Sequence, residues 1–197
     1  MTRIDVAREL APDVRGVTRT QYEALVGMGF FDDQRVELLR GMIVEMQPVD
    51  GPHGLAVQWL NMRFARRLAE ELHVRVQSSF AASDDSVPQP DLAVVRADWP
   101  YVDSTAPNPQ RSMLVIEVAN SSLRRDLRVK AGIYAEAEVD VYWVIDMVAR
   151  QVVVHRKRVE GAYTDIERVD PPAVVHAAEV EVALQDLFTF AFPPHLT

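Results

Sequence analysis

Three acidic residues of this sequence occupy positions where a carboxylate needs a specific role. Asp91 follows Pro90 at the head of an apolar run, and Glu117 interrupts a run that is otherwise Met, Leu, Val, Ile and Val. A lone carboxylate in such a strand is expensive to bury unless it is paired or binds a metal ion. Asp126 and Lys130 are spaced four residues apart, which places them on the same side of a helix. A strand and a following helix can therefore bring these groups around one cation.

Carboxylates and a lysine around one cation suit phosphodiester hydrolysis. Mg²⁺ prefers oxygen ligands and usually binds one or two carboxylates together with water and a substrate phosphate. The metal lowers the pKa of a bound water and stabilises charge on the transferring phosphoryl group. A lysine nearby can orient or deprotonate that water, or stabilise the charge of the transition state.

Each residue also has a structural explanation, and spacing alone is weak evidence for chemistry. Glu117 is also explained as a buried acid paired with an arginine, and Asp91 as a turn residue after proline. Asp126 and Lys130 match an ordinary ion pair on a helix surface, which contributes only about 0.3–0.5 kcal/mol. These alternatives stay open at the level of residue types.

The composition is that of an ordinary globular domain. The chain has 197 residues, 48% of them hydrophobic, enough for one domain with its own core. It has no cysteine, which excludes disulfides, cysteine-bound zinc and thiol catalysis. The net charge of -8 counts against a protein that simply coats nucleic acid. No apolar run is long enough to span a bilayer and the first residues lack a secretory pattern, so the cytoplasm is the expected location.

Hydrophobic periodicity predicts a mixed sheet flanked by helices. Helical spacing indicates three helices, at 18–28, at 53–72 and from 121 or 122 to about 137. Arg40-Gly41 is typical of the turn of a β-hairpin over 35–46. Strands are predicted at 74–80, 90–95, 113–118, 141–146 and 151–156, with further strands and a terminal turn between 163 and 187. The polar segments 81–89 and 98–111 are expected to be loops. Strands mixed with a few helices indicate an α/β domain.

The order of these motifs resembles the Uma-two family, which belongs to the PD-(D/E)xK nuclease superfamily. The resemblance lies in Pro90-Asp91, Glu117-Val118, the segment 126–134 with its lysine and tyrosine, and Tyr142-Trp-Val-Ile-Asp146. Upstream, Glu37-Leu-Leu-Arg-Gly41, Glu45-Met-Gln-Pro48 and His53 also resemble the N-terminal signature of that family. Together these segments extend from Thr18 to Arg156, which is most of the chain.

The resemblance implies a restriction-endonuclease-like fold and an Mg²⁺- or Mn²⁺-dependent endonuclease that hydrolyses phosphodiester bonds, in DNA first of all. Residues 1–17 would form a leader and 18–197 a single domain. The implied metal set is Asp91, Glu117 and Val118, and the implied catalytic set is Asp91, Glu117, Lys130 and Glu37. His53, Asp126 and Tyr134 are implied as supporting residues, although Glu37 is also explained as a solvent-facing hairpin acid and His53 as a residue that simply starts its helix.

Several features depart from the pattern or leave the function open. The superfamily's lysine would fall at Ala119, so Lys130 must replace it from the next helix, and Glu138 stands where the family usually has a helix-ending glycine. Beside Lys130, the basic residues Arg124, Arg125 and Arg128 suit either a solvated helix face or a phosphate backbone. The competing functions are an inactive nuclease fold that serves as a binding or assembly module, and a hydrolase or nuclease for another substrate, such as RNA or a structured intermediate. A homodimer is also expected, because cutting two strands often needs two sites.

Overall fold

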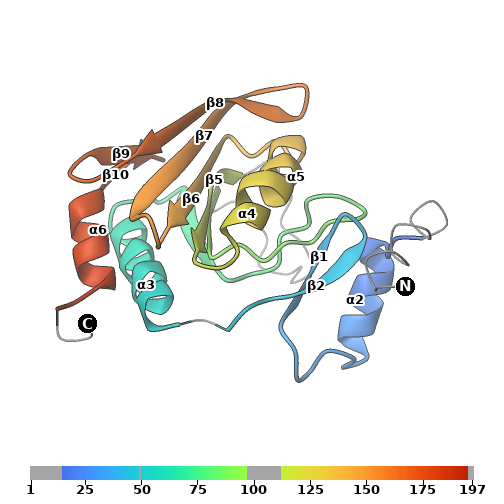
Figure 1. Ribbon diagram of the computed structural model, residues 1–197. Helices are drawn as coiled ribbons and strands as arrows, with labels where there is room; N and C mark the ends of the chain where they lie inside the picture. The colour runs from blue at the N-terminus through green and yellow to red at the C-terminus, as the bar shows by residue number, and fades with distance from the viewer. Residues whose placement is uncertain (1–14, 49, 97–111, 195–197) are drawn as a thin grey trace, which may run out of the picture.

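The protein is built around one six-stranded sheet. The computed structural model describes residues 15–48, 50–96 and 112–194. The strands lie in the order β3-β4-β5-β6-β7-β8, and β5 and β6 are parallel while the other neighbours are antiparallel (Figure 1). The strand bounds are β3 Leu72–Val76, β4 Leu92–Arg96, β5 Ser112–Ala119, β6 Val141–Asp146, β7 Gln151–Val159 and β8 Ala162–Val169.

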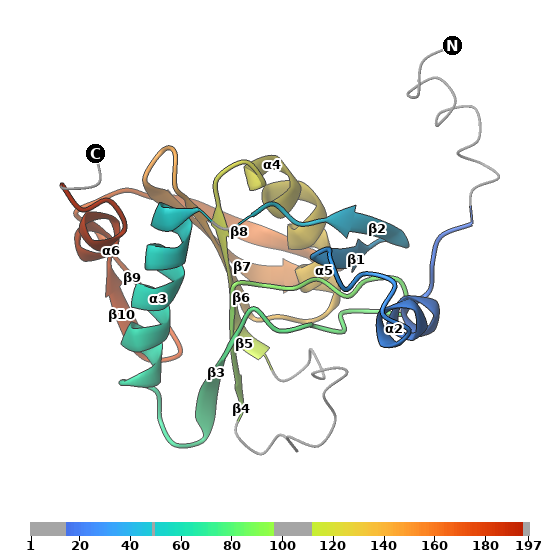
Figure 2. The same ribbon diagram turned by 90° about the horizontal axis from the view of Figure 1, so that it is seen from below.

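Helices cover both faces of this sheet, which explains why its central strands are apolar on both sides. One face packs against α3 (Gly51–Ala65) and α6 (Leu184–Ala191), and the small hairpin of β9 (Val174–Ala177) and β10 (Val180–Ala183) joins that core. The opposite face packs against the helical segment made of α4 (Leu123–Arg125), η2 (Asp126–Lys130) and α5 (Ala131–Glu136) (Figure 2). Trp143 in β6 is fully buried, as the apolar run of that strand predicts.

The N-terminal part of the described chain extends from one end of the sheet. It consists of α2 (Arg19–Gly27) and the hairpin of β1 (Val36–Leu39) and β2 (Met42–Glu45) (Figure 1). Thr18 caps α2 by accepting a hydrogen bond from the Gln21 backbone, as expected for a threonine before a helix. The hairpin turn at Arg40 and Gly41 has positive φ at both residues. Gly41 lies so close to Gly16 that a side chain on Gly41 would collide with the backbone of Gly16.

A π-helical turn interrupts the predicted helix after β5. The helix begins and ends close to its predicted bounds, but η2 has the wider hydrogen-bonding pattern, with the backbone N–H of Ala131 donating to Asp126. The buried hydroxyl of Tyr142 donates to the same Asp126 oxygen at 3.1 Å, which supports this turn. Glu138 follows with a φ of 62°, so the chain adopts a left-handed helix end there without the expected glycine.

Two sequence predictions of secondary structure were wrong, and the strand predicted over 74–80 is β3, which covers Leu72–Val76. The helix predicted over 53–72 begins at Gly51 and ends at Ala65, because Leu72 pairs with Arg96 as the first residue of β3. The predicted terminal turn is the amphipathic helix α6, whose buried side packs on α3. The predicted loop 98–111 lies outside the described residues, as do residues 1–14 of the predicted leader. In the described part of the chain, no helix is long and apolar enough to cross a membrane.

Candidate active site

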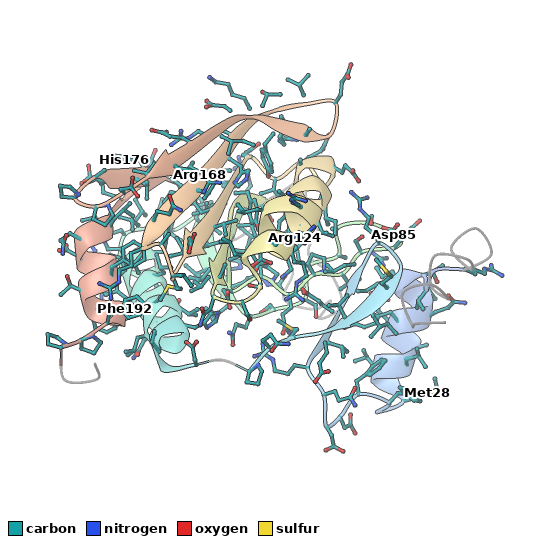
Figure 3. The ribbon with its side chains drawn as sticks, in the orientation of Figure 1. Met28, Asp85, Arg124, Arg168, His176 and Phe192 are labelled. Carbon is teal, nitrogen blue, oxygen red and sulfur yellow. The ribbon has the colours of Figure 1, made fainter. Side chains whose placement is uncertain are left out.

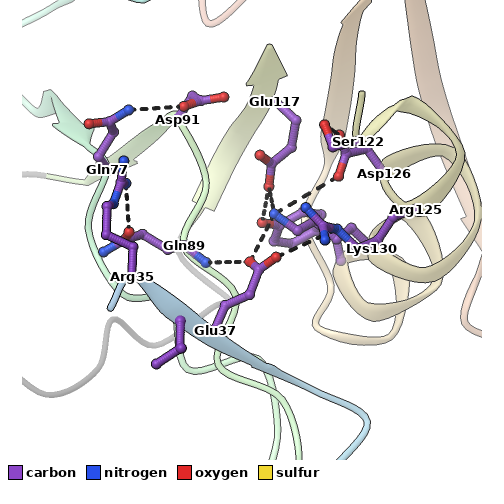
Figure 4. Close-up of polar contacts among 12 residues, drawn as sticks. Arg35, Glu37, Gln77, Gln89, Asp91, Glu117, Ser122, Arg125, Asp126 and Lys130 are labelled. Carbon is purple, nitrogen blue, oxygen red and sulfur yellow. Dashed lines mark hydrogen bonds and ion pairs between the residues drawn. The ribbon is translucent and has the colours of Figure 1, made fainter. Parts of the chain in front are cut away.

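Lys130 lies at the centre of a cluster of buried carboxylates. Its Nζ is 2.9 Å from Glu117 Oε1 and 2.9 Å from Glu37 Oε2, and 4.0 Å from Asp126 Oδ1 (Figure 4). The lysine side chain is only 2% exposed. Burial lowers the pKa of Lys130, but the surrounding carboxylates outweigh burial and raise this pKa above its usual value. The lysine is therefore a buried, charged member of the cluster.

Glu117 is held from the helical side of the sheet. Besides Lys130, the hydroxyl of Tyr134 donates to Glu117 Oε1 at 2.8 Å, and Tyr134 is fully buried. Burial raises the pKa of Glu117 well above its usual value, and the neighbouring carboxylates raise it further. Both donors use Oε1, so Oε2 is the oxygen of Glu117 left for another partner.

The β1–β2 hairpin brings Glu37 into the same cluster. Its side chain has no exposure to solvent, and Oε2 accepts a hydrogen bond from the Gln89 backbone at 3.2 Å. Arg125 Nε lies 3.8 Å from Glu37 Oε1. The solvent-facing alternative for Glu37 is therefore wrong: the side chain that points from β1 toward the sheet meets Lys130, which comes from a segment more than 90 residues later in the chain.

Asp91 lies beside Glu117 at the edge of the cluster. Its Oδ2 accepts a hydrogen bond from the Val118 backbone at 2.8 Å and contacts His53 Nε2 at 3.1 Å, and its Oδ1 accepts one from Gln77 at 3.2 Å. Burial raises the pKa of Asp91, but these hydrogen bonds outweigh it and the pKa lies below its usual value. Burial lowers the pKa of His53, and contact with Asp91 outweighs burial and raises that pKa.

The alternative in which Asp126 forms an ion pair on the helix surface is wrong, because the side chain is buried. Asp126 is 1% exposed, and the Ser122 hydroxyl donates to its Oδ2 at 2.6 Å. Burial raises its pKa. Its Oδ1 has no hydrogen-bond partner among the described residues, although it faces Lys130.

A pocket opens onto these groups. It offers about 90 Å³ that water-sized molecules can occupy, and its walls include Asp91, Glu117, Val118, Asp126 and Lys130. The sequence-predicted residues thus meet at one place, except Glu37 and Tyr134, which hold Lys130 and Glu117 from behind the pocket wall.

The chain is similar to a known protein family and to a solved structure. The sequence profile of the Uma2 family, described as "Putative restriction endonuclease", matches residues 19–189. The chain belongs to the Uma2 family. Its structure is similar to that of a "putative nuclease belonging to DUF820" from Anabaena variabilis ATCC 29413, with a TM-score of 0.70 over 89% of this chain and 99% of that chain. At 15% sequence identity this similarity shows the fold. No curated protein matches the chain significantly.

The Uma2 resemblance and the mixed α/β fold are both confirmed. The lysine two residues after the strand glutamate is absent here, and Ala119 occupies that position. In this Uma2 protein the ammonium instead reaches Glu117 from η2, thirteen residues later. The departure at Ala119 therefore leaves the lysine–glutamate contact in place.

The donor set of the Uma2 site suits a hard divalent cation. Three buried carboxylates, Glu37, Glu117 and Asp126, lie within 4.0 Å of the buried ammonium, and a fourth, Asp91, lies beside them, so the cluster holds more acidic than basic buried side chains. The β4–β5 register pairs Leu92 with Ile116, and continuing it places Pro90 opposite Val118. Because proline has no N–H, it cannot donate to the Val118 carbonyl, which makes that oxygen a possible ligand beside Asp91 and Glu117.

No three His, Asp or Glu side chains of the described residues form a ready-made metal cage. Mg²⁺ usually keeps several waters and takes only one or two protein carboxylates. Asp91 and Glu117, with water completing the coordination, are ligands of the type that this ion prefers.

Several residues of the site were missed by sequence reasoning. Gln77 and Gln89 stand at the two ends of the loop between β3 and β4 and bond to Asp91 and Glu37. Arg35 donates to the Gln89 side chain at 2.9 Å, and Ser122 orients Asp126. Glutamines in a polar loop carry no periodic signal, so only the fold shows that they face the carboxylates.

Proposed function

We propose that this protein is a divalent-metal-dependent endonuclease that hydrolyses phosphodiester bonds in DNA. The observation that carries the proposal is the lysine enclosed by carboxylates at the wall of a pocket, in a chain of the Uma2 family. We also propose a cytoplasmic enzyme, in keeping with its lack of cysteine, that acts as a homodimer so that two sites can cut two strands.

Asp91, Glu117 and the Val118 carbonyl would hold Mg²⁺ or Mn²⁺. The bound ion would lower the pKa of a water and neutralise charge on the phosphate. His53 and Gln77 hold Asp91 in place through its two oxygens. Such outer partners orient the ligands of a metal site and raise its affinity.

Lys130 is the residue best placed to act on the phosphate or on the attacking water. An ammonium group has three N–H donors, and two of them are directed at Glu37 and Glu117. The third is left for a substrate oxygen or a water in the pocket. Glu37 and Asp126 keep the ammonium charged and fixed, so that it can stabilise negative charge as the phosphoryl group transfers.

The test combines metal binding with cleavage. Mn²⁺ is titrated into the protein by calorimetry, and supercoiled plasmid DNA is incubated with the protein in Mn²⁺, in Ca²⁺ and in EDTA. We expect saturable Mn²⁺ binding and nicking or linearisation in Mn²⁺ alone. Single-stranded DNA and RNA are tested in parallel, and faster cutting of RNA would contradict the DNA assignment.

A matched variant separates a site from nonspecific metal binding. Asp91→Asn is expected to lose Mn²⁺ binding and cleavage together. Absence of Mn²⁺ binding in the folded wild-type protein would contradict the proposal and favour a binding module that kept the nuclease fold.

Tyr134→Phe is expected to weaken Mn²⁺ binding by about tenfold, because loss of an outer partner typically costs a metal site ten- to a hundredfold in affinity. Its hydroxyl orients Glu117 through the 2.8 Å hydrogen bond. The matched control is Tyr163→Phe, which also removes a buried hydroxyl, here one that donates to the Val139 backbone at 2.9 Å. Both variants are expected to lose about 1 kcal/mol of stability. Equal Mn²⁺ affinity in the two variants would show that Tyr134 has no positioning role.

A further inference from the structure

A second, shallow groove adjoins the site pocket on the outer side of α4 and η2. It is lined by Ser121, Ser122, Arg124, Arg125, Arg128 and Val129. Ser121, Ser122 and Arg125 also line the site pocket, so the two depressions are adjacent. Arg124 marks the position of α4 on the surface in Figure 3.

The basic residues of this segment differ in their exposure to solvent. Lys130 is buried among the carboxylates of the site, whereas Arg124 and Arg128 are exposed to solvent. Within the described part of the chain, neither of these two arginines forms an ion pair with a carboxylate. Arg125 is intermediate in exposure, with its Nε 3.8 Å from Glu37 Oε1.

The groove is basic, whereas the pocket mixes acids and bases. The pocket is lined by four acids together with Arg35, Arg125 and Lys130, but the lining of the groove contains three arginines and no acid. The nearest acid in sequence, Asp126, is buried and accepts the Ser122 hydroxyl, so it does not neutralise the groove. In a chain of net charge -8, this is a local site for an anion.

We propose that this groove binds the phosphodiester backbone of DNA next to the phosphate that is cleaved. The proposal rests on the proposed nuclease function and assigns the side from which the strand enters the site. Guanidinium groups bind phosphate oxygens through paired N–H donors. Val129 is 37% exposed and offers an apolar surface to a sugar. Such contacts position the strand and do not read its sequence.

The experiment measures binding of a short fluorescent DNA duplex by anisotropy, with Ca²⁺ in place of Mg²⁺, over a series of salt concentrations. The variant is Arg124→Gln/Arg128→Gln. The matched control is Arg66→Gln/Arg67→Gln, which removes two exposed arginines just beyond the opposite end of α3 from His53. Thermal unfolding of each variant verifies its fold.

We expect the groove variant to bind the duplex about ten- to a hundredfold more weakly at low salt. The slope of log affinity against log salt is expected to decrease by about two, since each lost phosphate contact removes about one released ion. The control is expected to keep both values. In cleavage, the groove variant is expected to raise KM and leave kcat unchanged, because its arginines do not reach the reacting phosphate.

The outcomes separate this inference from the proposed function. If Arg124→Gln/Arg128→Gln binds the duplex with wild-type affinity and salt slope, the proposal that the groove binds DNA is contradicted, even if the protein cleaves DNA. Arginine-dependent duplex binding by a wild-type protein that cleaves nothing supports the groove and contradicts the nuclease. If the wild-type protein binds no duplex, the proposal that the groove binds DNA is contradicted as well.

Discussion

Replacing Glu117 with Gln is expected to reduce metal-dependent DNA cleavage about 10³-fold, the upper range for loss of one electrostatic contact to a transition state. The substitution keeps the shape of the side chain and can still accept from Tyr134, but it removes the negative charge that would bind the cation. Cleavage is measured under single-turnover conditions, together with Mn²⁺ affinity by calorimetry.

The stability of this variant is expected to change by less than about 1 kcal/mol, which is small among single substitutions. Burial and the neighbouring carboxylates raise the pKa of Glu117, so the native cluster already disfavours its charge. Lys130 keeps its 2.9 Å contact with Glu37. Loss of activity in a folded protein therefore reports on chemistry.

Glu167→Gln is the control for this experiment. Glu167 lies on β8, where it pairs with Arg156 at the surface, and it is expected to have no effect on cleavage. Wild-type cleavage by Glu117→Gln would remove Glu117 from the metal set and leave the nuclease proposal without its central ligand.

Replacing Lys130 with Met is expected to lower the free energy of unfolding by about 3–5 kcal/mol, because loss of one partner leaves buried charges uncompensated. Three carboxylates face the ammonium within 4.0 Å. Urea unfolding in EDTA measures the change. The same variant is expected to lose cleavage, because it lacks the cation that faces the pocket.

Two comparisons test the electrostatic origin of this destabilisation. Lys157→Met removes an exposed lysine that pairs with Asp165 at 2.9 Å, and it is expected to change stability little because water screens that pair. Glu37→Gln/Lys130→Met is expected to be more stable than Lys130→Met alone, since it also removes one of the uncompensated carboxylates. If Lys130→Met unfolds at the same urea concentration as the wild type, the cluster does not depend on its ammonium.

Mn²⁺ is expected to stabilise Lys130→Met more than it stabilises the wild-type protein. A cation that binds only the folded state raises stability by mass action. In the variant it also supplies the positive charge that the carboxylates have lost. This differential effect would link the charge deficit of the cluster to metal binding.

The sequence by itself determined the central strands, the hairpin turn and most of the candidate residues. The apolar runs of β5 and β6 are typical of buried strands, and Arg40-Gly41 matches a turn that requires positive φ twice. Glu117 was noticeable because a carboxylate in such a run is costly. These are local signals, and they depend on neighbours within a few positions.

Only the tertiary structure decided which side chains meet. The sequence explained Glu37 equally well as a solvent-facing residue and as a site residue. The packing of the hairpin beside η2 places its side chain against Lys130. The helix after His53 ends at Ala65 because β3 must pair with β4, although its apolar spacing continues to Leu72.

The four basic residues between Arg124 and Lys130 show most clearly that the sequence alone does not decide which side chains are buried. Arg124, Arg125, Arg128 and Lys130 are similar charges on one short segment, and their sequence does not show which of them is buried. The fold buries Lys130 among carboxylates from β1 and β5 and leaves Arg124 and Arg128 exposed in the outer groove. Glu37 and Glu117, the two carboxylates nearest to Lys130, come from segments distant in sequence, so the burial of this lysine follows from the fold.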